Sequence, residues 1–81
     1  SIQRVYWIYD VNEEPRGRHR HKETYQALVC LQGKCEVLVK KQGQEQIFYL
    51  ESPTDILLLE PADWHEMREF QNKPILLVLA S

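Results

Sequence analysis

Residues 26–41, QALVCLQGKCEVLVKK, decide the fold class. Apolar residues recur at every second position on both sides of a Gln-Gly dipeptide. That period is typical of β-strands that bury one face, and a Gln-Gly pair between two such segments favours a two-residue hairpin turn. The predicted hairpin pairs Leu28 with Val37 and Cys30 with Cys35. The even positions before the turn and the odd positions after it then form one core-facing side.

The same pattern continues outward along the chain as short bursts separated by turn residues, and no convincing helical period interrupts it. Many short strands at close spacing predict an all-β sandwich or small barrel. The expected strands are residues 4–11, 18–22, 26–31, 35–41, 45–50, 55–60, 65–70 and 75–80.

Length and composition limit what the chain can carry. With 81 residues there is room for one domain, and we expect residues 1–81 to be a single domain trimmed at both ends. A hydrophobic content of 43% and a charged content of 27% argue against disorder. No apolar run approaches the roughly 20 residues of a membrane helix and no signal peptide is visible, so we expect a cytoplasmic protein that does not bind membranes. So small a core makes oligomerisation a reasonable expectation.

The two cysteines sit on either side of the predicted turn, in positions that suit small apolar residues. Cross-strand pairing would permit a disulfide between them, but a lone pair in a chain without a leader is expected to stay reduced. A single pair five residues apart is also a weak signal for zinc. We therefore predict two free, structural thiols.

The segment RGRHRHK, residues 16–22, places two histidines at i and i+2 among four cations, in a chain of net charge −2. It suits a metal site, an acid/base site for an anionic substrate, or a basic patch for nucleic acid. If the strand ran unbroken to the core-facing Gln26, then His19 and His21 would point outward. A β-bulge near residues 23–25 would bring all three side chains into one cavity.

Two motifs indicate a family. The H-x-H pair and the later segment EPADWHEM, residues 60–67, resemble the two sequence motifs of the cupin superfamily. More closely, RVYWIYDV, RGRHRHK, VCLQGKCEVLV, LESP, WHEM and LLVLAS resemble, in order over nearly the whole chain, the dTDP-sugar 3,4-ketoisomerases, a WxcM-like group of cupins. The resemblance implies a cupin jelly-roll barrel of about eight short antiparallel strands.

The resemblance also implies an activity. Members are homodimers with exchanged N-terminal strands that convert dTDP-4-keto-6-deoxyglucose to its 3-keto isomer in deoxysugar and glycan biosynthesis, without a metal or redox cofactor. The present chain lacks the family's N-terminal strands and its C-terminal tail. Either segment could complete the nucleotide site or the dimer interface, and the product's configuration at C4 does not follow from the sequence.

His19 and His21 match the catalytic pair of this family, and we assign His21 as the principal base and His19 as its partner. A histidine with a pKa near 6.5 suits proton transfer at neutral pH. Two residues apart on a strand, their Cβ atoms are about 7 Å apart and can reach adjacent carbons of one sugar ring. The sequence thus predicts acid/base catalysis without metal.

Five further residues are predicted to bind the substrate. Arg16 matches the family's R-G-x-H arginine and suits a diphosphate or a keto oxygen. The hydroxyl of Tyr6 can donate to a developing oxyanion, although an aromatic packed in the core is an equally good interpretation. Gln26 faces the cavity, Trp64 is either packing or a pocket wall, and His65 is a third polar group.

A metal-binding or non-catalytic cupin that binds a sugar-like molecule ranks second. His19, His21 and His65 would supply three imidazoles, enough for zinc or iron. Metal-binding cupins usually add a glutamate that is separated from the second histidine by three or four residues, and those positions hold Tyr25 and Gln26 in this chain. Nucleic-acid binding fares worse, because the cations are confined to one segment of a mildly acidic chain.

Overall fold

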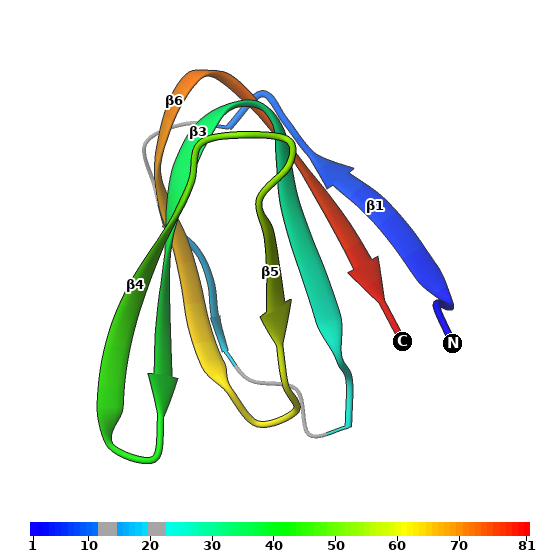
Figure 1. Cartoon of the computed structure of the whole chain (residues 1–81), viewed down its shortest axis with the longest axis vertical. Coiled ribbons are helices and arrows are strands. Elements are labelled where there is room, and N and C mark those ends of the chain that lie inside the picture. Colours follow the sequence, from blue (N-terminus) through cyan, green and yellow to red (C-terminus); the bar gives the residue numbers. More distant parts are fainter. Residues whose placement is uncertain (12–14, 20–22) are drawn as a thin grey trace.

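The computed structural model describes residues 1–11, 15–19 and 23–81. In this part of the chain there are six strands and no helix, so no helix long and apolar enough to cross a membrane is found (Figure 1). All strand pairs are antiparallel, which confirms the predicted all-β fold. The strands are β1 (Arg4–Ile8), β2 (Arg16–His19), β3 (Gln26–Lys41), β4 (Gln44–Leu50), β5 (Ile56–Leu59) and β6 (Trp64–Ala80).

The predicted hairpin at Gln32–Gly33 is wrong. β3 continues through this step as one strand, so Leu28 does not pair with Val37 and Cys30 does not pair with Cys35. The two halves of β3 instead find partners on β6 and on separate edge strands. In the same way, the expected strands 65–70 and 75–80 are one strand, β6, which is why six strands replace the eight expected.

β3 and β6 bend together at one place, which we call the apex. Their pairing shifts register three times between Cys30 and Glu36. Gly33 has a left-handed φ of 71°, and a Cβ there would lie 2.7 Å from the backbone oxygen of Asn72, so only glycine allows this approach. The side chain of Gln32 donates a hydrogen bond of 2.8 Å to the backbone oxygen of Lys73 and ties the two bends together.

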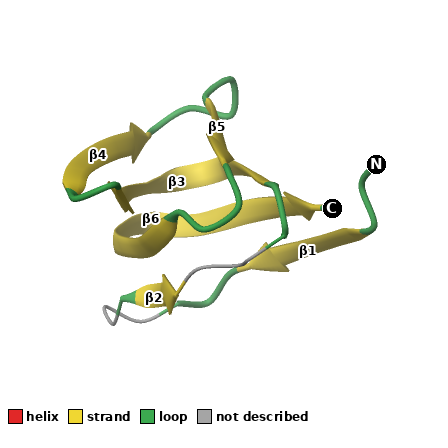
Figure 2. Ribbon diagram, turned by 90° about the horizontal axis from the view of Figure 1, so that it is seen from below, coloured by secondary structure: helices red, strands yellow, loops and turns green. Residues whose placement is uncertain are grey.

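The six strands form one hydrogen-bonded sheet, which the apex folds into two layers that we call sheet I and sheet II. Sheet I consists of β1, residues 75–80 of β6, residues 26–30 of β3, and β5. Sheet II consists of β2, residues 64–68 of β6, residues 35–41 of β3, and β4. Seen from below, β3 and β6 lie between the pair β4 and β5 on one side and the pair β1 and β2 on the other (Figure 2).

The core lies between the inner faces of the two sheets. Alternation sends every second side chain inward, and the apolar ones form a single cluster. From sheet I it contains Leu28, Cys30, Leu57, Leu59, Leu76 and Val78, and from sheet II Cys35, Val37, Val39, Leu50 and Met67. Both cysteines are buried and free, as predicted.

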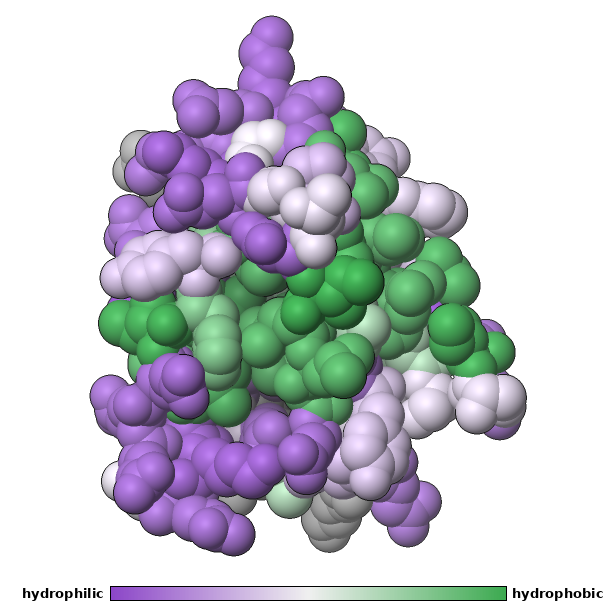
Figure 3. All heavy atoms as spheres, in the orientation of Figure 1, coloured by the Kyte–Doolittle hydropathy of each residue, from purple (hydrophilic) through white to green (hydrophobic). Residues whose placement is uncertain are grey.

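The barrel is open along the line between β4 and β5. Each of these strands pairs with β3 and not with the other, and a cleft of about 350 Å³ separates them. Inner-face residues such as Phe48 and Leu57 line the cleft, with Lys41 and Asp63 at one end. Figure 3 shows hydrophobic side chains across the middle of the face that these two strands frame, between hydrophilic bands.

Candidate active site

Two polar side chains of the inner faces lie at the end of the sheets away from the apex, which we call the mouth. Gln26 is four residues from Cys30 on sheet I, and His65 pairs with Val39, four residues beyond Cys35 on sheet II. Only 6% of Gln26 and 3% of His65 is exposed. The core is therefore apolar toward the apex and carries an amide and an imidazole at the mouth.

β2 pairs with β6 beside His65. Arg16 is opposite Met67 and Gly17 is opposite Glu66, whereas His19 is opposite His65. Two steps along β2 thus match one step along β6, which defines a β-bulge. A bulge was predicted nearer residues 23–25; the structure places one earlier, between Gly17 and His19.

Of the two predicted catalytic histidines, only His19 lies within the described part of the chain. The backbone of His19 lies on β2, at the register position opposite His65 and hence at the mouth. His21 lies outside the described residues. β2 does not run on into β3 as one strand, because residues 23–25 are not part of a strand.

Tyr6 and Arg16 lie on strands at the edges of the two sheets. Tyr6 is opposite the core residue Val78, one inner-face position further toward the apex than Gln26, and 39% of it is exposed. Arg16 is opposite the core residue Met67 and is exposed. The structure therefore brings Tyr6, Gln26 and His65 to the inner faces near the mouth, with Arg16 at the edge of sheet II.

Trp64 is not brought to this site. It precedes His65 on β6 and lies on the outer face of sheet II, opposite Lys40. The ammonium of Lys40 is 4.6 Å from the centre of the indole ring, within the range of a cation–π contact. Of the two interpretations of Trp64 drawn from the sequence, the geometry supports packing rather than a pocket wall.

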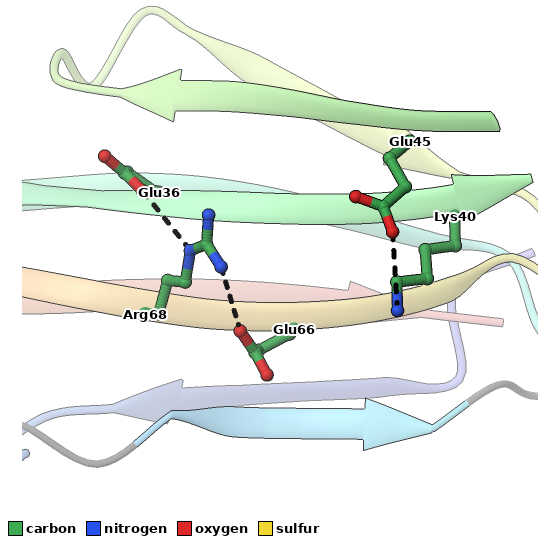
Figure 4. A network of polar contacts seen from close by, with 5 residues as sticks. All are labelled: Glu36, Lys40, Glu45, Glu66 and Arg68. Carbon is green, nitrogen blue, oxygen red and sulfur yellow. Dashed lines mark hydrogen bonds and ion pairs between the residues drawn. The ribbon is translucent and has the colours of Figure 1, made fainter.

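Sequence reasoning missed a charged network on the outer face of sheet II, next to His65. The guanidinium of Arg68 donates through Nη1 to Glu66 and through Nε to Glu36, both at 3.3 Å (Figure 4). Glu66 is buried, although it points away from the core. Opposite charges at every second position of the segment HEMR were the available signal, because such positions share one face of a strand.

Asp63 was also missed, and it organises the turn that leads into His65. Its Oδ2 accepts a hydrogen bond of 3.0 Å from the backbone N–H of Glu60, while its own N–H donates to the backbone oxygen of Glu60. Lys41 lies 3.3 Å from the carboxylate of Glu60 and 3.7 Å from that of Asp63. The hydrogen bond to Glu60 is the main influence that raises the pKa of Lys41. The segment EPAD contains proline and aspartate, which favour turns, and this was the signal that could have identified the hydrogen-bonded turn.

Fold and site together define part of a jelly-roll barrel of the cupin type, with an imidazole and an amide at its mouth. The sequence model of the family described as WxcM-like, C-terminal (FdtA) matches residues 1–81. Over its full length the chain is also 48% identical to the TDP-4-oxo-6-deoxy-alpha-D-glucose-3,4-oxoisomerase of Aneurinibacillus thermoaerophilus. The chain belongs to this family and spans 59% of the length of that relative.

Solved structures agree with this assignment. The QdtA 3,4-ketoisomerase of Thermoanaerobacterium thermosaccharolyticum, as a double mutant with TDP, superimposes on 99% of the chain with a TM-score of 0.94 and 42% identity. A histidine-to-asparagine mutant of QdtA, in complex with TDP-4-keto-6-deoxyglucose, matches equally well at 40% identity. The chain covers 59% of each. The sugar epimerase NovW of Streptomyces spheroides, of which the chain covers 46%, shares the fold alone, at 15% identity and a TM-score of 0.83 over 99% of the chain.

Proposed function

We propose that the protein is a 3,4-ketoisomerase that converts dTDP-4-keto-6-deoxyglucose to its 3-keto isomer. The observation that carries the proposal is the pairing of β2 with β6, which sets His19 opposite the buried His65 at the mouth. Gln26 lies on the inner face of the other sheet at the same end. Imidazole and amide groups on facing walls suit a small polar ring that must exchange protons on one of its faces.

The reaction is a proton relay that needs no external oxidant or reductant. A base removes the proton from C3, and the electron pair of that C–H bond moves into a C3–C4 double bond, so that O4 becomes an enediolate oxygen. A proton then returns to C4, the O3 hydroxyl loses its proton as O3 becomes the new carbonyl oxygen, and O4 takes up a proton to become a hydroxyl. C3 and O3 each lose one proton while C4 and O4 each gain one, so substrate and product have the same composition.

Roles follow from the chemistry and from the family. His21 is the principal base and His19 its partner in returning the proton. His65 and Gln26 form hydrogen bonds with the oxygens attached to the sugar ring, since an imidazole and an amide can each donate one hydrogen bond and accept another. Tyr6 stabilises the enediolate, and Arg16 binds the diphosphate, because a guanidinium matches phosphate oxygens in a bidentate fashion.

The substrate class is supported by what the relatives bind. QdtA was crystallised with TDP and with TDP-4-keto-6-deoxyglucose. A diphosphate-linked sugar is doubly charged and does not cross membranes unaided, so the reaction belongs in the cytoplasm, where nucleotides are made. The product would feed the synthesis of deoxysugars for surface glycans.

The test uses the full-length polypeptide in metal-free deuterated buffer, with dTDP-4-keto-6-deoxyglucose followed by NMR at C3 and C4. The expected result is a 3-keto sugar that carries solvent deuterium at C4. His19→Asn and His21→Asn should each abolish it, whereas Gln42→Asn, in the exposed β3–β4 turn, should not. Full activity in both histidine variants would overturn the mechanism, and activity that requires added zinc or iron would favour a metal-binding cupin instead.

We also propose that the protein is a homodimer and that a second copy covers the outer face of sheet I. Register places two rows of apolar side chains on this face. One row is Val5, Leu79, Ala27 and Leu58, and the other is Trp7, Leu77, Val29 and Ile56.

Exposure and charge single out this face. Leu58 is 72% exposed and Ile56 64%, more than any other large hydrophobic side chains among the described residues. The outer face of sheet II carries ion pairs instead, such as Arg68 with Glu36 and Lys40 with Glu45. A contiguous apolar face on one sheet is what a self-complementary twofold interface requires, whereas a charged face is suited to water.

A further inference from the structure

Gly17 is the residue at which β2 departs from regular pairing. Its φ is +90°, in the left-handed region that side chains rarely adopt, and the extra residue of the bulge, Arg18, follows it directly. A glycine in the left-handed conformation at the first position defines one of the common types of β-bulge. The register of β2 beyond this point therefore depends on the backbone of Gly17.

The bulge decides which residue of β2 lies opposite His65. With regular pairing continued from Gly17 and Glu66, the position opposite His65 would belong to Arg18, and His19 would be opposite Trp64. The single extra residue moves His19 one position along and sets it opposite His65. Because side chains alternate along a strand, a shift of one residue exchanges the two faces.

Gly17 also lies against the ring of His65. A Cβ at Gly17 would be 3.0 Å from the backbone oxygen of His65, 3.3 Å from Cδ2 and 3.5 Å from Nε2. Because the ring is buried, it has little room to retreat. The missing side chain thus leaves the space in which the Cδ2–Nε2 edge of the imidazole rests.

We propose that Gly17 is a positioning residue of the isomerase, acting through His65. Its left-handed backbone sets the register that brings His19 opposite His65, and its missing side chain fixes where the imidazole of His65 lies. This inference rests on the proposed function for its effect on catalysis. The placement of the ring can be tested without it.

The chain offers a matched control for the test. Gly43 has a φ of +79°, and a Cβ there would meet nothing within 4 Å. Gly17→Ala and Gly43→Ala therefore carry a similar backbone strain, but only the first adds an atom against His65. Gly17→Asn is the companion variant if Gly17→Ala does not fold, because asparagine tolerates the left-handed conformation better than alanine does.

The first measurement is the imidazole signals of His65 in ¹H–¹⁵N correlation spectra, assigned by their loss in His65→Asn. We expect them to shift in the Gly17 variants and to stay in place in Gly43→Ala. The second is steady-state kinetics of the full-length enzyme. Gly17→Ala should lower kcat about 100-fold with little change in KM, as expected for a misplaced group, while Gly43→Ala should change kcat less than about threefold.

A double-mutant cycle between Gly17 and His65 distinguishes an effect on the position of the ring from a general loss of structure. In the His65→Asn background the substitution Gly17→Ala should cost less than it does alone, because the part of the cost that comes from the displaced ring has been removed. Additive effects, or equal effects of the Gly17 and Gly43 variants, would overturn the proposal. If the His65 signals shift as expected but the parent enzyme has no isomerase activity, the proposed function fails and the placement of the ring by Gly17 stands.

Discussion

Arg68 and Glu36 are register partners on neighbouring strands of sheet II, and the guanidinium Nε of Arg68 lies 3.3 Å from the carboxylate of Glu36. The same guanidinium reaches Glu66 at 3.3 Å, so one cation joins two carboxylates, one of them buried. Lys40 and Glu45, also register partners, form a longer contact of 3.6 Å with both side chains well exposed. The two ion-paired sites on this face therefore differ in how deeply their carboxylates are buried.

Replacing Arg68 by Met should destabilise the fold by about 1–2 kcal/mol, because it leaves the buried carboxylate of Glu66 without its cation. Lys40→Met, the matched change in the exposed pair, should cost less than about 1 kcal/mol for the ion pair and the contact with Trp64 together. Urea unfolding of the two variants measures both costs. Equal costs would mean that the burial of Glu66 has no energetic consequence.

Stability should fall at alkaline pH because of the buried thiols. Burial raises the pKa of Cys35 from its ordinary value of 9.0 to about 12, and the neighbouring Cys30 adds to the rise. The unfolded chain ionises this thiol near pH 9 while the folded chain keeps it neutral, so the stabilisation present below pH 9 is lost between pH 9 and 12. The loss should approach about 1.4 kcal/mol per pH unit.

Urea midpoints at pH 8, 9, 10 and 11 check this expectation against Cys35→Ala. Lysines and tyrosines titrate in both proteins, so the difference between the two curves reports the thiol. The parent should lose stability more steeply than the variant. Parallel curves would show that Cys35 does not keep its proton in the folded state.

Gln26 and Trp64 were both assigned to the substrate site from the sequence, and kinetics can separate them. Gln26→Leu removes a buried amide at the mouth and should lower kcat/KM about tenfold, the value of one hydrogen bond. Trp64→Leu removes a side chain on the outer face and should change kcat/KM less than about twofold. The reverse order of effects would show that substrate approaches from the outer face of sheet II.

A single charge on the outer face of sheet I should split the proposed dimer. Leu58→Glu would bury a carboxylate against an apolar partner surface, and the expected species is a monomer by light scattering after gel filtration. Tyr49→Glu places the same charge at a similarly exposed site on the outer face of sheet II and should leave the dimer intact. A monomeric parent protein would refute the interface.

The fold class could be predicted because alternation is a local property, and it also identified most core positions. Continuity at Gln32–Gly33 could not be predicted. A Gln-Gly step suits a hairpin turn and a bend equally well, and what selects the bend is the matching irregularity near Asn72 and Lys73 on β6, some 40 residues away. A match between two bends so far apart in the chain cannot be recognised in a single sequence.

The candidate site shows the same division. Parity placed Gln26 on an inner face, and the structure agrees. Parity also indicated that one extra residue was needed near the histidines, but counting residues does not locate a bulge. Its position at Gly17 depends on the fit of β2 against His65 on another strand.

The shared bend of β3 and β6 has a mechanical consequence. Both walls of the mouth are formed by the same two strands, β3 and β6, which bend together at the apex. The walls cannot separate as independent sheets; widening the mouth requires β3 to change its angle at Gly33 and β6 to change its angle at residues 71–74, whose backbone packs directly against Gly33. The aperture offered to a sugar ring is thus set at the far end of the barrel.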